Sequence, residues 1–383
     1  MQFFLFNFRE VLELSVKYII DIDKVEQLSQ EEKKELKKVT EKYKFRANDY
    51  YLGLINWDDP DDPIRNLIIP QIGELEEWGR LDASNEKSYT ISKGLQHKYR
   101  DTALLLVNDV CGGFCRFCFR KRLFINVGAE VVRDVSEDLE YIKQHKEITN
   151  VLLTGGDPLL LSTKKLENII KQIREIEHVQ IIRIGSKMVA FNPYRIIEDP
   201  ELIEMIKKYS TNEKKIYIMT QFNHPNEITD VAIKAVNMLL KAGAILANQT
   251  PLIKGVNANW KTLMELFKKL SFIGVPPYYV FQGRPVAGNK PFAVPVEEGY
   301  QIFLKAIMNI SGLAKRARFA MSHETGKIEV AGLTKEHIIF RYQRAHDPNN
   351  AGKFMVFKRN PNAYWLDDYK ELVEEYVIDN PLL

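Results

Sequence analysis

The spacing of apolar residues changes after residue 95. Up to that point the chain is rich in Lys and Glu, and apolar positions such as Leu36 and Val39 recur at the spacing of one helix face. Ser29 and Glu32, just ahead of that face, have the spacing of a capping box. We therefore expect residues 1–95 to form an N-terminal helical cover.

Beyond residue 95, short apolar runs alternate with amphipathic stretches, which is the pattern of parallel βα units. Six runs are predicted to be strands: 103–107, 150–154, 180–185, 216–221, 244–249 and 278–282. Asp199 and Thr229 suit helix N-caps, and Gly243 suits a helix end. Because six units are too few for an eight-fold barrel, we expect an α/β fold whose residues 96–282 form an open, partial (βα)6 TIM-like barrel. The active site should lie at the C-terminal ends of its strands.

Residues 283–383 show a weaker pattern. A helix is predicted at about 296–310, followed by loops that contain Gly, Asn and Lys and by an acidic amphipathic stretch at 367–377. We expect this segment to be a C-terminal extension that closes over the barrel.

The composition is that of an ordinary globular chain. Of its 383 residues, 45% are hydrophobic and 27% are charged, and 54 Lys and Arg against 51 Asp and Glu leave a net charge of +3. So balanced a chain has no electrostatic preference for nucleic acid or an anionic membrane. Residues 1–10 lack the basic region and cleavage site of a signal peptide, and no apolar run reaches the roughly 18 residues of a membrane span. We therefore expect a cytoplasmic protein without nucleic acid or membrane partners.

Three cysteines, Cys111, Cys115 and Cys118, follow directly on the first predicted strand. An odd number of thiols so close together cannot form a disulfide framework and favours a metal or cluster site. Three thiolates can hold three irons of a [4Fe–4S] cluster and leave the fourth iron open for an inner-sphere reaction. The alternative is a zinc loop, but a structural zinc site needs four protein ligands, and neither a fourth cysteine nor a nearby histidine is present in the sequence.

The C-x3-C-x2-C spacing, with Phe117 before the last cysteine, resembles the radical S-adenosylmethionine (SAM) superfamily. The resemblance implies the partial barrel, a [4Fe–4S] cluster on the three cysteines, and SAM that is cleaved to a 5′-deoxyadenosyl radical. The stretch 154–157 is similar to the family's GGE-type motif, although Gly-Gly-Asp is also a common turn. The SAM-binding residues that the resemblance implies are Phe117, Gly155, Gly156, Asp157, Ser186, Gln221 and Gln249.

A closer resemblance runs from about residue 50 to about residue 345. The segments that carry it, in matching order, are 97–111, 152–159, 221–229, 248–249 and 277–279. They are similar to lysine 2,3-aminomutase and its relatives, which use pyridoxal 5′-phosphate (PLP) beside SAM. The resemblance therefore implies an isomerase with a PLP-binding lysine, a phosphate site and a residue that binds the substrate carboxylate.

Lys327 stands at the end of a segment similar to the family's glycine-rich loop, which implies that it is the catalytic, PLP-binding lysine. Partial burial would lower its pKa and make it nucleophilic, whereas a solvated lysine in a hairpin turn is the alternative. Thr102 replaces a second arginine that is typical of the family's phosphate segment. The PLP-binding residues implied in that segment, for which a basic surface turn is the alternative, are Lys98, Tyr99 and Arg100.

Arg120 matches the arginine that binds the substrate α-carboxylate, and a bidentate guanidinium suits that task. Its alternative role is to neutralise an anionic cluster as part of a basic run. Relatives that act on lysine hold the distal ammonium with two aspartates, whose places align here with Arg284 and Ala320. Because a cation cannot receive an ammonium, Arg284 is expected to bind an acidic or amide side chain, such as that of glutamate.

The expected function is a radical SAM, PLP-dependent 2,3-aminomutase that moves the amino group of an L-amino acid other than lysine from Cα to Cβ. Such an enzyme is oxygen-sensitive and needs a flavodoxin- or ferredoxin-type reductant, and we expect a homo-oligomer. Two alternatives stay open. One is a radical SAM enzyme without PLP that modifies a small molecule or a protein lysine, and the other is an iron–sulfur electron carrier.

Overall fold

The structure, a computed structural model, describes residues 16–377, so the segment 1–10 discussed above lies outside it. No helix in the described range combines the length and the apolar character that a membrane crossing requires. Thirteen strands, β3 to β15, form one sheet in which neighbours in space are also neighbours in sequence. A separate pair is formed by β1 (Tyr18–Ile19) and β2 (Ala47–Asn48).

The parallel part of the sheet is the expected partial barrel. All six predicted strands are present within two residues of their predicted ends: β5 (Thr102–Asn108), β6 (Asn150–Gly155), β7 (Ile181–Ser186), β8 (Ile216–Thr220), β9 (Ile245–Pro251) and β10 (Pro277–Phe281). Their side chains form the main hydrophobic core, in which Leu153 and Ile184 are fully buried. A seventh strand, β11 (Arg318–His323), pairs with β10 in parallel. The parallel sheet therefore extends one strand beyond the prediction.

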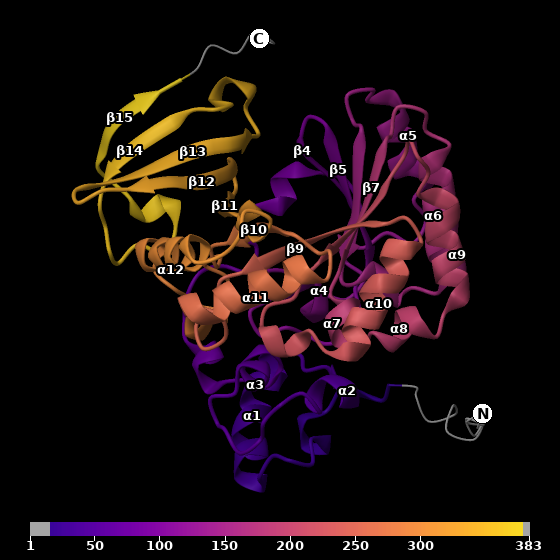
Figure 1. Ribbon diagram of the computed structural model, residues 1–383, viewed down its shortest axis with the longest axis horizontal. Coiled ribbons are helices and arrows are strands. Elements are labelled where there is room, and N and C mark those ends of the chain that lie inside the picture. The colour runs from indigo at the N-terminus through magenta and orange to yellow at the C-terminus, as the bar shows by residue number, and fades with distance from the viewer. Residues whose placement is uncertain (1–15, 378–383) are drawn as a thin grey trace.

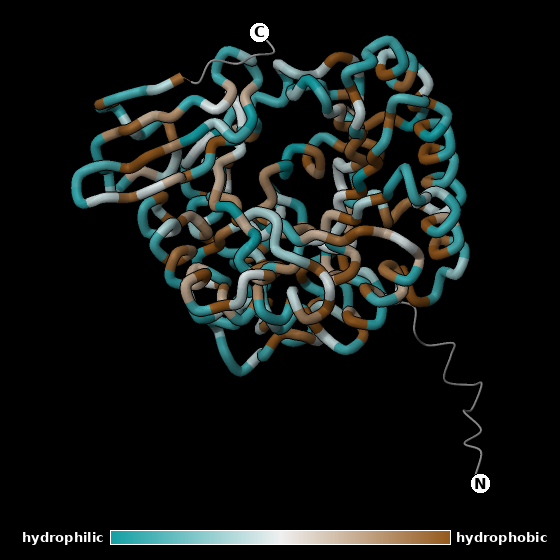
Figure 2. Tube along the Cα trace, turned by 45° about the horizontal axis from the view of Figure 1, so that its top comes forward, coloured by the Kyte–Doolittle hydropathy of each residue, from teal (hydrophilic) through white to brown (hydrophobic). Residues whose placement is uncertain are grey.

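Helices cover the outer face of this sheet (Figure 1). They are α5 (Ser136–Gln144), α6 (Thr163–Arg174), α9 (Pro200–Tyr209), α10 (Asp230–Lys241), α11 (Trp260–Phe272) and α12 (Val296–Met308). The predicted caps are confirmed, because the side chains of Asp199 and Thr229 accept hydrogen bonds from the first turns of α9 and α10. Along these helices hydrophobic and hydrophilic segments alternate, as Figure 2 shows, which is the pattern of a helix with one face on the core.

The C-terminal region is more regular than its sequence suggested. Where loops were expected, four antiparallel strands continue the sheet: β12 (Gly326–Leu333), β13 (His337–Ala345), β14 (Phe354–Lys358) and β15 (Leu372–Tyr376). On β13, Ile338, Phe340 and Tyr342 are buried and alternate with more exposed residues. This period of two is the strand signal that the sequence analysis overlooked. The acidic stretch 367–377 contains β15, whose residues are all exposed.

The N-terminal region contains the expected helices and two strands that join the main sheet. The helices are α1 (Gln30–Lys42), α2 (Asp49–Leu52) and α3 (Pro63–Ile68), and the strands are β3 (Thr90–Ser92) and β4 (Leu95–Tyr99). The capping box of α1 is confirmed, with Ser29 and Glu32 hydrogen-bonded in both directions. The helices share a second hydrophobic cluster, against which Cys115 and Phe117 pack. The N-terminal helices, which form the indigo region below the barrel in Figure 1, therefore cover the cysteine segment.

Candidate active site

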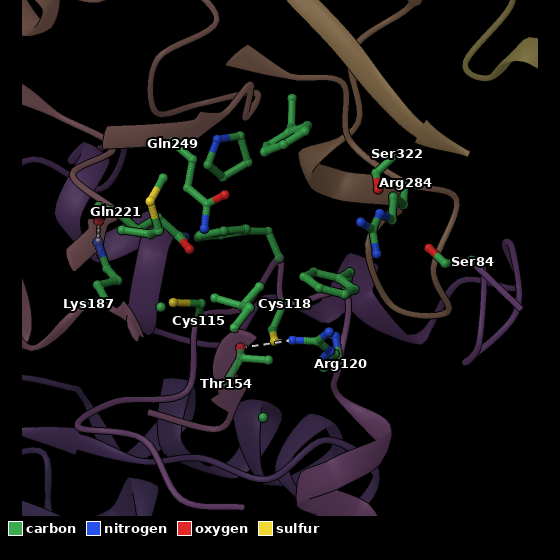
Figure 3. A pocket seen from close by; sticks show the side chains of 18 of the residues that line it. Ser84, Cys115, Cys118, Arg120, Thr154, Lys187, Gln221, Gln249, Arg284 and Ser322 are labelled. Atoms are coloured by element: carbon green, nitrogen blue, oxygen red, sulfur yellow. Dashed lines mark hydrogen bonds between the residues drawn. The ribbon is translucent and has the colours of Figure 1, made fainter. Parts of the chain in front are cut away.

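A cavity of about 360 Å³ opens at the C-terminal ends of the parallel strands, where the sequence predicted the active site. Two groups of its lining residues matter for the chemistry. We call the first the cysteine end: Cys111, Cys115, Cys118, Asp157 and Lys187. We call the second the lysine end: Lys98, Arg183, Arg284, Lys327 and Arg344. Figure 3 shows Lys187 and Cys115 on one side of the cavity and Arg284 on the other.

Almost all of the sequence-predicted site residues line this one cavity. Beyond those at the two ends, they are Tyr99, Phe117, Arg120, Gly155, Gly156, Ser186, Gln221 and Gln249. Arg100 is different, because it follows the end of β4, is exposed, and does not line the cavity. Ala320 is buried in β11, away from the lining.

The cysteine segment is held in place by backbone and side-chain contacts from the N-terminal region. The Nε of Arg46 donates to the carbonyl of Cys111 at 2.7 Å, and the amide of Asn48 donates to the carbonyl of Gly112 at 3.0 Å. Arg116 forms a fully buried ion pair with Glu74 at 2.8 Å. These contacts orient the segment so that its three thiols face the same cavity.

The three thiols fit the expected cluster. Burial raises the pKa of the Cys115 thiol to about 12, so the metal-free side chain is protonated. Bound iron would supply the positive charge that stabilises the thiolates. In residues 16–377, His, Cys, Asp and Glu side chains form no group of three that is close enough for a single ion. An iron–sulfur cube instead takes each thiolate at a different corner.

The Gly-Gly-Asp motif forms a turn that packs on the strand beside it. Gly155 has φ +115°, and a Cβ on Gly156 would lie 2.4 Å from the carbonyl oxygen of Val110. The glycines therefore permit a close approach between backbone segments. The buried carboxylate of Asp157 accepts the backbone N–H of Lys187 at 2.7 Å and that of Leu159 at 3.0 Å, and burial raises its pKa to about 6. The Gly-Gly-Asp segment therefore forms a turn and also lines the cavity.

Lys187 is a functional candidate that the sequence analysis missed. Its ammonium forms a buried ion pair with Glu227 and donates to the carbonyl of Gln221 at 2.9 Å. No sequence motif marks Lys187, because it lies between Ser186 and a short apolar segment.

Arg120 is positioned by a carboxylate that the sequence analysis also missed. Its Nε and Nη2 donate to Glu86 at 3.2 and 2.9 Å. Its Nη1 donates to the hydroxyl of Thr154 at 3.0 Å, as the dashed line in Figure 3 marks. Arg122 donates to the same carboxylate at 2.5 Å. Burial would raise the pKa of Glu86, but Arg120 and Arg122 outweigh it and hold this pKa well below its usual range. Glu86 is therefore an ionised, fully occupied acceptor.

Arg284 faces the cavity without an acidic partner. Its guanidinium lies over the ring of Phe119, with 3.8 Å between the Cζ and the ring centroid, and its Nη1 is buried with no hydrogen-bond acceptor among the described residues. Burial lowers its pKa to about 10. An unpaired buried guanidinium is costly, so this side chain is poised to receive an anion.

Lys327 lies on β12 in a strongly cationic environment. Its ammonium is 4.1 Å from the centroid of the Tyr279 ring, and burial, followed by the charges of Arg183 and Arg344, lowers its pKa to about 7. The preceding Gly326 is needed for strand packing, because a Cβ there would lie 2.3 Å from the carbonyl oxygen of Arg344. Lys327 is therefore partly neutral near pH 7 and able to act as a nucleophile.

The remaining residues of the lysine end surround it. Lys98 donates to the carbonyl of His323, and the hydroxyl of Tyr99 is buried without a hydrogen-bond partner in the part of the chain that the structure describes. Arg183 and Arg344, neither of which the sequence analysis singled out, add two guanidinium groups to the lining. The arrangement can hold an anion with several oxygen atoms.

Comparison with known proteins gives consistent matches. The model of the radical SAM superfamily matches residues 105–267. A protein of Aquifex aeolicus (strain VF5), named "Putative L-lysine 2,3-aminomutase", is 60% identical over 94% of this chain and 97% of its own length. The L-lysine 2,3-aminomutase of Acetoanaerobium sticklandii is 37% identical over 75% of this chain and 69% of its own. The glutamate 2,3-aminomutase of Clostridioides difficile (strain 630) is 35% identical over 80% of this chain and 72% of its own.

Proposed function

We propose that this chain, which belongs to the lysine 2,3-aminomutase family of the radical SAM superfamily, is a 2,3-aminomutase for an L-amino acid with an acidic side chain. Membership in the family implies an isomerase with a [4Fe–4S] cluster, SAM and PLP. When bound, the cluster and SAM supply one-electron chemistry and hydrogen abstraction, and PLP carries the migrating nitrogen.

The cysteine end has the residues for the first two cofactors. Cys111, Cys115 and Cys118 would ligate three irons, and the polar groups of Gln221 and Gln249 face the same space (Figure 3). The N-terminal helices contribute to the hydrophobic cluster against which Cys115 and Phe117 pack, and so they cover one side of this segment. The reductant, for which a flavodoxin or ferredoxin is expected, and the expected homo-oligomer stay predictions.

The lysine end has the properties that PLP requires. Lys327 has a pKa of about 7, which leaves a useful fraction of neutral amine to attack the cofactor carbonyl. Lys98 and the unpartnered hydroxyl of Tyr99 offer donors to a phosphate. The ring of Tyr279 beneath the lysine offers a flat surface for the cofactor ring.

The observation that carries the substrate assignment is the unpaired guanidinium of Arg284. Arg120 would bind the α-carboxylate, and Arg284 would bind a second carboxylate on the substrate side chain. A lysine substrate would instead place its ammonium near Arg284. The nearby carboxylate of Glu86 cannot offset that repulsion, because Arg120 and Arg122 already occupy it. The relatives' names include both lysine and glutamate, and the charge of Arg284 favours glutamate.

Borohydride trapping tests the PLP assignment. The protein would be reconstituted with iron and sulfide under anaerobic conditions, incubated with PLP, reduced with borohydride and analysed by peptide mass spectrometry. We expect a phosphopyridoxyl group on Lys327 that is lost in Lys327→Ala. Lys358→Ala, which removes an exposed lysine of β14, is the matched control and should keep the adduct.

A substrate panel tests the aminomutase assignment. Glutamate, aspartate, glutamine and lysine would each be incubated with the reduced holoenzyme and SAM, with β-amino acid formation as the readout. We expect turnover of an acidic substrate. Robust turnover of lysine with none of the acidic amino acids would contradict the assignment. SAM cleavage without an adduct on Lys327 would instead support a PLP-independent radical enzyme, and no SAM cleavage would support an electron carrier.

A further inference from the structure

Two cations stand directly opposite each other at the lysine end. In the antiparallel pairing of β12 and β13, Lys327 is the register partner of Arg344. Like charges at directly opposed positions destabilise a sheet. Both side chains nevertheless line the cavity together with Arg183, Arg284 and Lys98. The pair is therefore expected to share an anion or to leave Lys327 neutral.

Arg344 is held in place from behind. Its Nη2 forms an ion pair with Asp101, and both of its terminal nitrogens lie 3.3–3.4 Å from the hydroxyl of Thr102. The Cζ of its guanidinium lies 4.3 Å from the centroid of the Tyr99 ring. The hydroxyl of Thr102 in turn donates to Asp101 at 2.9 Å. These contacts fix the plane of the guanidinium and leave further N–H groups of Arg344 free to donate.

A hydrogen-bond donor without a partner lies beside this guanidinium. The hydroxyl of Tyr99 is buried and has no partner among the described residues, and a buried hydroxyl normally finds one. Lys98, one residue earlier on β4, adds an ammonium to the same wall. Three kinds of donor, a guanidinium, a phenol and an ammonium, therefore border one part of the cavity next to Lys327. That set suits the three terminal oxygens of a phosphomonoester.

We propose that Arg344, oriented by Asp101 and Thr102, binds the phosphate of a phosphorylated aldehyde cofactor. The aldehyde carbon of that cofactor would bond to the amine of Lys327, and the carbonyl oxygen would leave as water. This inference rests on the proposed function and adds a phosphate-binding residue to it. Arg344 belongs to β13, and its guanidinium lies beside Thr102. Thr102 is the position at which this chain lacks the second arginine of the family's phosphate segment.

The test compares PLP with pyridoxal, which has the same aldehyde and no phosphate. Dissociation constants of both ligands would be measured by absorbance titration of the anaerobic protein with an intact cluster. We expect Arg344→Gln to weaken PLP binding by about 10- to 100-fold, as the loss of a charge-assisted hydrogen bond does, and to leave pyridoxal binding within about 2-fold. A purely structural role would weaken both ligands equally.

Two further variants sharpen the test. Arg341→Gln is the matched control, because Arg341 is on the same strand, pairs with Glu329 at 2.5 Å and does not line the cavity. It should change neither affinity. Thr102→Arg combined with Arg344→Gln returns a guanidinium to the same neighbourhood from β5, and it should restore the preference for PLP over pyridoxal.

The outcomes separate this inference from the function on which it rests. Loss of phosphate selectivity in Arg344→Gln, with trapping on Lys327 retained, supports the inference. Equal weakening of both ligands, or no weakening of either, overturns it while the PLP assignment stands. If the unaltered protein shows no adduct on Lys327, both the proposed function and the inference fail.

Discussion

The two ends of the cavity handle buried charge in opposite ways. At the cysteine end, Lys187 is paired with Glu227, and the nearby Arg116 is paired with Glu74. At the lysine end, Lys327 and Arg284 form no ion pair within residues 16–377. The charges that act on Lys327 are cations, and the carboxylate of Glu86, which acts on Arg284, is already paired with Arg120 and Arg122. The buried cations of the cysteine end are therefore neutralised by carboxylates of the protein, whereas Lys327 and Arg284 at the lysine end are not.

This difference shows what each end is built to bind. Uncompensated buried cations are unfavourable unless an anion joins them, so the lysine end is expected to bind phosphate and carboxylate groups. The paired charges of the cysteine end fix the conformation of the cysteine segment and of the loops around it. The thiols of the cysteines are expected to bind a positively charged metal cluster.

The largest effect is expected from a single cysteine. Cys115→Ser should abolish assembly of the cluster, because three ligands are needed to leave a single iron open. Iron content should fall, and reductive cleavage of SAM should drop to the level of a protein-free control. Phosphopyridoxyl labelling of Lys327 should survive, since the two ends are separate. Loss of both functions together would contradict the contrast.

Breaking a compensated pair should strongly destabilise the fold. Glu227 is fully buried and accepts hydrogen bonds from Lys187 and from the hydroxyl of Tyr51 at 2.6 Å. Glu227→Gln should lower the free energy of unfolding by about 3–5 kcal/mol, because it leaves a buried ammonium unpaired. Urea denaturation would measure the change. Glu375→Gln, which breaks a more exposed pair with Lys353, is the control and should cost about 1 kcal/mol or less.

The depressed pKa of Lys327 predicts a pH dependence at the lysine end. A lowered lysine pKa means that the neutral amine dominates above about pH 7. The rate of PLP capture should therefore rise about tenfold per pH unit below that value and level off above it. Stopped-flow absorbance would follow the capture. Arg344→Gln removes a like charge and should move the midpoint upward; a downward shift would contradict the electrostatic account.

The smallest effect is a gain in stability. Arg284→Met removes an unpaired buried cation, so the ligand-free protein should become more stable by about 1 kcal/mol while the affinity for an acidic substrate falls. The same change at the cysteine end, Lys187→Met, should destabilise the protein because it leaves Glu227 unpaired. Urea denaturation of both variants would measure these opposite signs. Similar destabilisation by both would show that the two ends do not differ in charge compensation.

Much of the fold could be predicted because its signals are local. Apolar runs and helix caps fall on nearby residues, which is why the six barrel strands and the caps at Asp199 and Thr229 were found. The C-terminal sheet was missed, although the alternation of Ile338, Phe340 and Tyr342 was present in the sequence. Loop-forming residues between these strands obscured a signal that a period-two search would have found.

The site divides in the same way. The three cysteines were found because their spacing lies within one short segment of the chain. Family resemblance pointed to Lys327, Arg120 and the SAM candidates, and all of these residues line the cavity. Arg100 was expected to bind PLP together with Lys98 because the family resemblance of this segment implied it, yet Arg100 follows the end of β4 and is exposed. Closeness in sequence does not set the direction in which a side chain points.

The sequence by itself determined the partial barrel, the cysteine segment and the family, because these depend on the spacing of residues along one chain. Only the tertiary structure decided the balance of charge in the cavity. Arg344 donates a hydrogen bond to Thr102, which is 242 positions away in the sequence, and Arg120 donates one to Glu86, which is 34 positions away. Burial and pairing decide whether a charge is compensated, and both depend on which distant segments the fold brings together.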